Sequence, residues 1–214
     1  DAWDKNSDGQ LTKEELPPNI RKNFEKADAN SDGVISRDED SAFRRRAVQR
    51  GNAPRQTRTP ANIEVKADLA YAETDNPRQK LDLFLPEKRA TDKPLPLVAF
   101  IHGGGWTVGS HERVHAKPSH FHKSGYYFAS TGYRVLPDAP VEVQASDVGA
   151  AISALHGQAS SIGFDRDKIV LVGHSAGAHL AALVATDPSY AGDAFDAIEG
   201  VILLDGAGYD VAAN

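Results

Sequence analysis

The chain has 214 residues, 40% of them hydrophobic, a formal net charge of −6, and neither cysteine nor methionine. This length accommodates one large domain, or one medium domain with a small module. The lack of cysteine excludes disulfides, thiol catalysis and cysteine-ligated zinc, and the acidic balance gives no indication of a nucleic-acid partner. No apolar run approaches the ~20 residues of a membrane span. Because the first residue is Asp1 rather than Met, we expect a trimmed N-terminus or a fragment.

Charge is distributed unevenly along the chain. Residues 1–43 carry eleven acidic and six basic side chains, residues 44–60 carry six arginines and no acid, and residues 61–214 hold the remaining negative charge. We therefore expect a small acidic module at 1–43, a basic linker at 44–60 and a main domain at 61–214.

The acidic module contains two similar stretches, DKNSDGQLTKEE from Asp4 and DANSDGVISRDE from Asp28. Each has Asp, Asn and Asp at positions 1, 3 and 5, Gly at 6, a branched apolar residue at 8 and Glu at 12. This is the pattern of the EF-hand calcium loop, in which Gly permits a sharp turn and the other positions supply oxygens to Ca²⁺. The predicted ligands are Asp4, Asn6, Asp8, the Gln10 carbonyl and Glu15 in the first loop, and Asp28, Asn30, Asp32, the Val34 carbonyl and Glu39 in the second.

The pair of loops resembles EF-hand proteins. We expect Leu11 and Ile35, both at loop position 8, to form the short pairing between the loops. Pro17 and Pro18 should shorten the helix that leaves the first loop, and Phe24 marks the helix that enters the second. A solvated acidic turn is the alternative, and two complete loops in tandem argue against it. Since the module has no Met and little apolar surface, we expect a structural or buffering role rather than a calcium sensor.

The basic segment RRRAVQRGNAPRQTRTP opens as the end of a helix and becomes a linker at Gly51–Pro60, where Gly, Asn, Pro and Thr accumulate. Its arginines are compatible with an anionic partner. The favoured interpretation is a solvated helix end and linker that balance the acidic neighbour.

The main domain alternates between strand and helix patterns. Residues 63–72 and 79–86 show period-2 alternation around the turn TDNPR and predict an antiparallel pair. Apolar strands and helices then follow, giving the order β-β-β-α-β-α-β-α-β. This order predicts an α/β fold with a largely parallel sheet and helices on both faces, with the active site at the carboxyl ends of strands.

One such strand end carries GHSAG at 173–177, between the strand pattern KIVLV and the helix pattern AHLAALVA. This arrangement is typical of a nucleophile elbow, where a serine takes a strained conformation in a very tight turn. We expect neighbouring backbone to pass close to Gly173 and Gly177, which would leave no room for a side chain at either position. Ser175 is the candidate nucleophile, and the start of the following helix favours a developing oxyanion.

A second strand end carries HGGGW at 102–106, in the manner of the glycine-rich oxyanion loops of lipases and esterases. We expect the N–H groups of Gly104 and Gly105, with that of Ala176 from the elbow, to bind the oxyanion. A phosphate-binding loop is the alternative, but Val108 stands where G-x-G-x-x-G requires its third glycine.

From Ile63 onward the chain resembles the α/β-hydrolase family, and within it the hormone-sensitive-lipase-type and kynurenine-formamidase-like esterases. The matching stretches are HGGGW, YRVLPDAPVEVQASDVGAAI and GHSAGAHLA. The resemblance implies a mostly parallel sheet with antiparallel first strands, incomplete at its C-terminal end, preceded here by the small all-α EF-hand module. It also implies hydrolysis of a small-molecule carboxylic ester, or of an aryl formamide, through an acyl-enzyme without a catalytic cofactor.

A serine nucleophile of this fold requires an acid and then a histidine later in the chain. His179 is the only histidine after Ser175. It lies one turn into the next helix and is assigned to packing behind the elbow. Asp205 and Asp210 are carboxylate candidates, but the resemblance places the acid one strand later. We therefore expect the acid and the base beyond Asn214.

The remaining histidines are assigned by their neighbours in sequence. His102 is expected to be structural, and His156 and His174 are expected to be surface and elbow residues. A zinc site is a further alternative for the four histidines that follow the oxyanion loop, which are His111, His115, His120 and His122.

Two hypotheses follow for the function. In the first, the chain is the N-terminal part of a calcium-binding serine esterase with a complete triad in the whole protein. In the second, it is a calcium-binding protein with an inert hydrolase-like domain. Paired EF-hands on a hydrolase suit the calcium-rich exterior, so we expect a secreted or periplasmic location. The oligomeric state is left open by the sequence.

Overall fold

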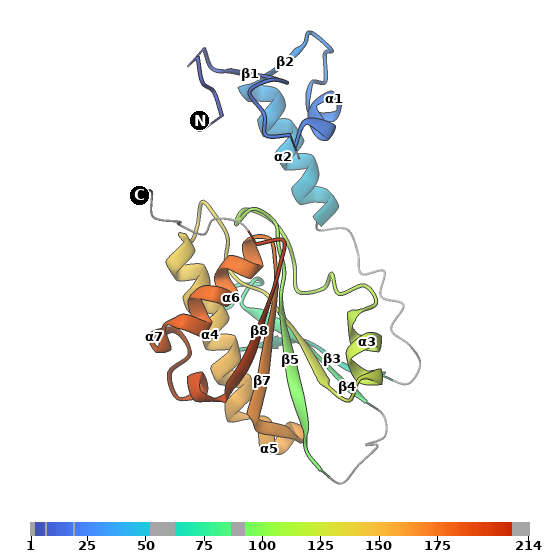
Figure 1. The fold of residues 1–214 in the computed structure, drawn as a ribbon, viewed down its shortest axis with the longest axis vertical. Helices are drawn as coiled ribbons and strands as arrows, with labels where there is room; N and C mark the ends of the chain where they lie inside the picture. The colour runs from blue at the N-terminus through green and yellow to red at the C-terminus, as the bar shows by residue number, and fades with distance from the viewer. Residues whose placement is uncertain (1–2, 7, 19, 52–62, 87–92, 207–214) are drawn as a thin grey trace. The chain divides into compact units, whose positions relative to one another are not determined.

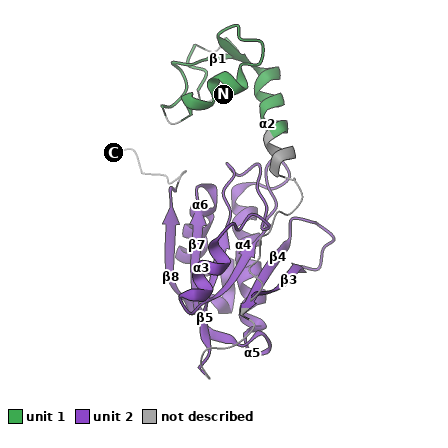
Figure 2. Ribbon diagram, turned by 90° about the vertical axis from the view of Figure 1, so that its right-hand side faces the viewer, with its two compact units in different colours: residues 1–53 green, residues 54–214 purple. Residues whose placement is uncertain are grey.

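The computed structural model of the chain divides into two compact units, residues 1–53 and residues 54–214 (Figure 2). Each unit has its own buried hydrophobic core. Residues 52–60 of the predicted 44–60 linker, and the acid candidate Asp210, lie outside the residues that the structure describes. Those described are 3–6, 8–18, 20–51, 63–86 and 93–206.

The N-terminal unit consists of two short strands and three helical segments: β1 (Gln10–Thr12), η1 (Arg21–Asn23), α1 (Phe24–Ala27), β2 (Val34–Ser36) and α2 (Arg37–Gly51). The strands pair antiparallel with Leu11 opposite Ile35, as predicted. Both side chains are buried with Phe24 in the small core of this unit. Helix α2 continues to Gly51, so the first part of the basic segment is helical.

The second unit contains a six-stranded mixed sheet, whose strand order is β3-β4-β6-β5-β7-β8. The pairs β3/β4 and β4/β6 are antiparallel, and β6/β5, β5/β7 and β7/β8 are parallel. The predicted antiparallel first strands and the largely parallel remainder are therefore confirmed. The strands are β3 (Ile63–Ala70), β4 (Lys80–Pro86), β5 (Leu95–Ile101), β6 (Tyr127–Thr131), β7 (Phe164–His174) and β8 (Ile198–Leu204).

Helices cover both faces of this sheet (Figure 1). Helices α4, α6 and α7 lie on one face, and α3 lies on the other. The helical segments are α3 (Lys117–Lys123), α4 (Val141–Gly157), α5 (Ala159–Ile162), α6 (Ala176–Thr186), α7 (Pro188–Ala191) and η2 (Gly192–Ala197).

The core follows the sequence periodicity. Val148, Ile152 and Leu155 recur at helical spacing in α4, and all three are buried against the sheet. Strand β5 is covered on both faces, which is why its sequence is continuously apolar rather than alternating. Burial of one such aliphatic side chain contributes about 1.5–3 kcal/mol, so this central strand fixes the position of the loop that follows it.

No helix among the described residues combines the length and the hydrophobicity that crossing a bilayer requires.

Candidate active site and calcium loops

Ser175 lies alone between the end of β7 at His174 and the start of α6 at Ala176. Its backbone has φ 52° and ψ −121°, a conformation that non-glycine residues seldom adopt and that defines a nucleophile elbow. The Ser175 N–H donates to the Leu204 carbonyl at 2.9 Å, and the Ser175 carbonyl accepts from the Ala178 N–H at 2.9 Å. Strand β8 and helix α6 therefore hold the strained residue from both sides.

The two glycines of the elbow are required by close backbone contacts. A methyl group on Gly173 would lie 2.3 Å from the Gly177 carbonyl oxygen, and one on Gly177 would lie 2.3 Å from the carbonyl oxygen of Ile101. Real Cβ atoms do not approach backbone this closely. The contacts expected from the sequence are thus present, and the Gly177 contact packs the elbow against the end of β5.

The glycine-rich loop after β5 touches the elbow directly. A methyl group on Gly103 would lie 2.7 Å from the His174 carbonyl oxygen and 3.0 Å from the Ser175 Cβ. Gly104 has φ 145° and Gly105 has φ 56°, both in regions that favour glycine. The loop predicted to bind an oxyanion therefore lies next to the predicted nucleophile.

The loop's shape leaves its predicted donors available. The Gly104 carbonyl accepts from the N–H groups of Thr107 and Val108 at 3.2 and 3.1 Å, which closes a tight turn. Among the described residues, the N–H groups of Gly104 and Gly105 donate to no protein acceptor. The N–H of Ala176 is in the first turn of α6, where no intrahelical acceptor exists.

His102 supports the loop from beneath. It is buried, its ring stacks on that of Tyr133 with centroids 4.2 Å apart, and its carbonyl accepts from the Tyr133 hydroxyl at 2.7 Å. Its Nδ1 donates to the Gly103 carbonyl at 3.0 Å. Burial lowers the pKa of His102 to about 4, so the ring is neutral at pH 7. These contacts suit a structural role.

Trp106 closes the other end of the loop. Its backbone has φ 61°, and its carbonyl accepts from the Leu136 N–H at 2.8 Å and from Gln144 Nε2 at 3.1 Å. Its indole meets the ring of His179 edge-on, with centroids 5.8 Å apart. His179 thus packs on the loop that faces the elbow.

The other histidines are dispersed. His174 is exposed at the elbow, as expected. The prediction that His156 is a surface residue is wrong, because His156 is buried on α4 and its Nε2 accepts from Arg166 Nε at 3.0 Å. Its position four residues after the buried Ile152 is the sequence signal that indicates this.

A site made from the four histidines after the oxyanion loop is not assembled. His111 is buried beside Asp68, whereas His115 and His120 are exposed. His122 donates through Nε2 to the Phe84 carbonyl at 2.9 Å, and burial lowers its pKa.

The acid candidate Asp205 follows β8 directly and has φ 49°. It is next in sequence to Leu204, whose carbonyl accepts from the Ser175 N–H. Within the described residues, no hydrogen bond joins a histidine to the Ser175 side chain. A complete triad is therefore not formed by this part of the chain.

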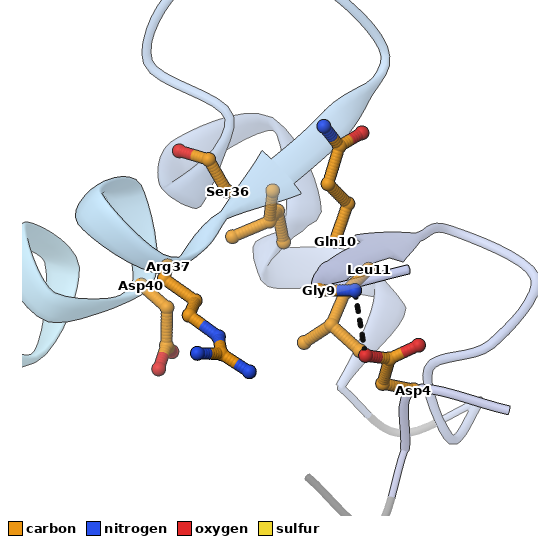
Figure 3. A pocket seen from close by; sticks show the side chains of 8 residues that line it. Asp4, Gly9, Gln10, Leu11, Ser36, Arg37 and Asp40 are labelled. Atoms are coloured by element: carbon orange, nitrogen blue, oxygen red, sulfur yellow. Dashed lines mark hydrogen bonds between the residues drawn. The ribbon is translucent and has the colours of Figure 1, made fainter. Parts of the chain in front are cut away.

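The two acidic loops of the N-terminal unit have the same internal geometry. Gly9 and Gly33, at loop position 6, have φ 81° and 90°, as the predicted turn requires. The Gly9 N–H donates to Asp4 at 2.9 Å (Figure 3), and the Gly33 N–H donates to Asp28 at 3.0 Å.

The last acidic residue of each loop closes it. Glu15 accepts from the Thr12 N–H and hydroxyl at 2.8 Å, and Glu39 accepts from the Ser36 N–H and hydroxyl at 3.0 and 2.9 Å. These hydrogen bonds, of which the backbone bond is the largest cause, lower the pKa of both carboxyls and keep them ionised.

The donor chemistry of the loops fits Ca²⁺. The carboxylates of Asp28, Asp32 and Glu39 place one oxygen each within 4.8 Å of one another. Hard oxygen donors around a turn of this shape are what Ca²⁺ prefers. The first loop repeats the bonds of the second at equivalent positions.

The sheet order, the elbow at Ser175 and the glycine loop against it define an α/β hydrolase of the esterase type. The BD-FAE family profile matches residues 81–199, and the chain belongs to this family. The EF-hand profile matches residues 1–16 and 20–39, which contain the two acidic loops.

Similar proteins include esterases and a formamidase. A probable isoprenylcysteine α-carbonyl methylesterase of Arabidopsis thaliana is 35% identical over 55% of this chain and 24% of its own length. The kynurenine formamidase of Danio rerio is 31% identical over 67% of this chain and 46% of its own. The structure of esterase B from Lactobacillus rhamnosis, inhibited by a tributyrin phosphonate, is 30% identical with a TM-score of 0.61, covering 77% of this chain and 53% of that one. The chain thus spans between about a quarter and a half of the length of these relatives.

Proposed function

We propose that the protein is a serine carboxylic-ester hydrolase that acts through an acyl-enzyme, with Ser175 as its nucleophile. The observation that carries the proposal is the contact between Gly103 and Ser175, because it puts a loop of free N–H groups beside a strained serine. The names of the relatives support an ester, or a formamide, as substrate.

The reaction begins when Ser175 Oγ attacks the substrate carbonyl and a general base accepts its proton. The carbonyl oxygen becomes an oxyanion, which accepts hydrogen bonds from the N–H groups of Gly104, Gly105 and Ala176. One such donor typically stabilises the transition state by about 3 kcal/mol. The base then returns the proton to the leaving oxygen, so that the intermediate releases the alcohol and leaves an acyl ester on Ser175. Water hydrolyses this ester by the same steps, releasing the carboxylic acid and restoring the Ser175 hydroxyl.

Within the described residues, Asp205, directly after β8, is the candidate acid. We infer instead that the base and the acid are supplied by a segment outside residues 1–214. Two observations support this inference. The chain spans half or less of the curated relatives' length. The edge strand β8 also exposes apolar side chains, with Ile202 45% and Leu204 42% exposed, as a sheet would if a further strand paired with it.

The N-terminal unit is proposed to bind Ca²⁺ through the loop oxygens predicted from the sequence, at a structural or buffering site. The matching hydrogen bonds of the two loops and the EF-hand profile support Ca²⁺ binding. A secreted or periplasmic location is proposed with it, because weak EF-hand sites fill at the millimolar calcium of such compartments.

The hydrolase proposal is tested by p-nitrophenyl acetate hydrolysis with the whole protein that contains this sequence. Ser175→Ala should lower turnover by roughly 10⁴–10⁶-fold. Ser146→Ala, an exposed serine on α4, is the matched control and should leave turnover unchanged. The 214-residue chain alone should turn over little ester.

Turnover that survives Ser175→Ala would refute the proposal. The alternative, a calcium-binding protein with an inert hydrolase-like domain, rests on the missing histidine partner of Ser175 among the described residues. It predicts no turnover by the whole protein, and calorimetric Ca²⁺ binding that Asp28→Ala weakens.

A further inference from the structure

A second cluster of ionisable side chains lies apart from Ser175, where the β3–β4 hairpin meets the segment after the oxyanion loop. It consists of Asp68 on β3, Asp82 on β4, and the neighbours His111 and Glu112. His111 and Asp82 are buried, with 5% and 1% of their surfaces exposed. Neither the proposed esterase mechanism nor the EF-hand module uses these residues.

The donor atoms of this cluster converge. His111 Nε2 lies 3.1 Å from Asp68 Oδ1 and 3.6 Å from Asp82 Oδ1. One donor atom each from Asp68, His111 and Glu112 lie within 4.8 Å of one another. Two donors about 2.1 Å from one zinc ion, at angles between a right angle and a tetrahedral angle, are separated by about 3.0–3.4 Å. The His111–Asp68 pair already has this separation.

The chemistry of the donors indicates the kind of ion. An imidazole with carboxylates suits zinc-type transition ions, whereas Ca²⁺ and Mg²⁺ prefer sites made of oxygen alone. His111 Nε2 faces carboxylate oxygens of both Asp68 and Asp82, and an imidazole N–H donates to only one of two such acceptors at a time. A metal ion would instead bind several of these donors at once.

We propose that Asp68, His111 and Glu112 form a binding site for a divalent ion of the zinc type. Asp82 supports the site from the buried side. Its Oδ1 accepts the Asp68 N–H at 2.9 Å, and this bond fixes the backbone that presents the Asp68 carboxylate. Supporting contacts of this kind orient ligands around metals.

The ion would join the β3–β4 hairpin to the chain that leaves the oxyanion loop. Arg78, in the turn between β3 and β4, already donates to the Gly109 carbonyl at 3.2 Å, two residues before His111. A bound metal ion would add a second interaction between the same two segments. The site would therefore stabilise the structure near the oxyanion loop and take no part in the reaction.

The test is calorimetric titration of ZnCl₂ into the protein with Ca²⁺ in saturating excess, so that the EF-hand loops are filled. One zinc ion per chain should bind. His111→Gln should abolish this binding, and Asp68→Asn and Glu112→Gln should each weaken it at least roughly tenfold. The matched control is His120→Gln, an exposed histidine in the same segment, which should bind zinc as the parent protein does.

A thermal melt with and without ZnCl₂ gives an independent readout, because an ion that binds only the folded state raises the Tm. The rise should be present in the parent protein and in His120→Gln. Should His111→Gln fail to fold, the variants of Asp68 and Glu112 carry the test. The proposal is overturned if no zinc binds, if these variants bind zinc like the parent, or if His120→Gln alone loses the ion.

Discussion

The backbone N–H of Ser175 donates to the carbonyl of Leu204 at 2.9 Å, which ties the candidate nucleophile to the last residue of the edge strand β8. Ser175 holds a strained conformation, and such conformations persist only where surrounding structure enforces them. The parallel pairing of β7 with β8, from Ile169 to His174, is part of that enforcement. The geometry of the elbow therefore depends on a strand that forms the edge of the described sheet.

The contact between α6 and β5 gives a direct test of the elbow's packing. Gly177→Ala places a methyl group 2.3 Å from the Ile101 carbonyl oxygen, so backbone must shift. We expect a loss of stability of about 1–3 kcal/mol, with a larger proportional loss of esterase turnover because the loop and elbow separate. Chemical denaturation and ester hydrolysis measure the two effects.

The control for this substitution is Gly157→Ala on α4, where open space surrounds the added methyl group. Its stability should be unchanged or slightly higher, because alanine restricts the unfolded chain. Equal effects of the two substitutions would show that the contact at Gly177 is unimportant.

Because the folded domain keeps His102 neutral, mild acid should make the main domain less stable. Burial lowers the folded-state pKa to about 4 from an ordinary value of 6.5. Between these values the unfolded chain binds more protons, so the free energy of unfolding falls as pH falls through this window. The contribution lost between pH 7 and pH 4.5 is about 2 kcal/mol.

His102→Phe should remove this contribution while keeping a ring on Tyr133. Urea unfolding at the two pH values should then show a smaller acid-induced loss in the variant than in the parent. An equal loss in both proteins would contradict a neutral, buried His102.

The Arg134–Asp147 ion pair should stabilise the contact between α4 and the segment that follows β6. Asp147 is buried and accepts from Arg134 Nε and Nη at 2.8 and 2.7 Å, and from Gln79 Nε2 at 2.9 Å. Asp147→Asn removes the charge and breaks this network, so we expect the free energy of unfolding to fall by about 3 kcal/mol. Asp138→Asn, an exposed acid in the preceding loop, should change stability little. Chemical denaturation measures the unfolding midpoint of each variant. Similar midpoints for the two variants would contradict a stabilising role of the Arg134–Asp147 pair.

Calcium binding at the second loop should require Glu39. Glu39→Gln removes one ligand charge at loop position 12, and we expect the calorimetric heat of that site to be lost. Asp38→Asn changes charge by the same amount at an exposed neighbour and should retain the site. Retention of both sites by Glu39→Gln would contradict the assignment of this residue as a ligand.

Local patterns predicted the parts of the molecule that depend on local geometry. Each EF-hand loop is determined by residues within a stretch of twelve, and the elbow by glycines two positions from Ser175. The contacts at Gly173 and Gly177 show why those positions exclude side chains. Strand type likewise followed from period-2 or continuous apolar patterns.

Features that combine distant segments could not be predicted in this way. The pairing of β4 with β6, and the meeting of Asp68 with His111, bring together residues far apart in sequence. No spacing along the chain encodes such a meeting. The wrong prediction for His156 has a different cause. His156 lies four residues after the buried Ile152, so helical periodicity alone places it on the buried face of α4.

The most direct test of the central claim, that Ser175 is an activated nucleophile, is mass spectrometry of the whole protein after reaction with paraoxon. A serine nucleophile attacks the phosphorus of this compound and displaces p-nitrophenolate, so an activated Ser175 would retain a diethyl phosphoryl group. We expect one diethyl phosphoryl adduct per chain, on the peptide that contains Ser175, and none after Ser175→Ala or after unfolding. An unmodified Ser175 in a folded protein that still hydrolyses esters, or an adduct on another residue, would contradict the account.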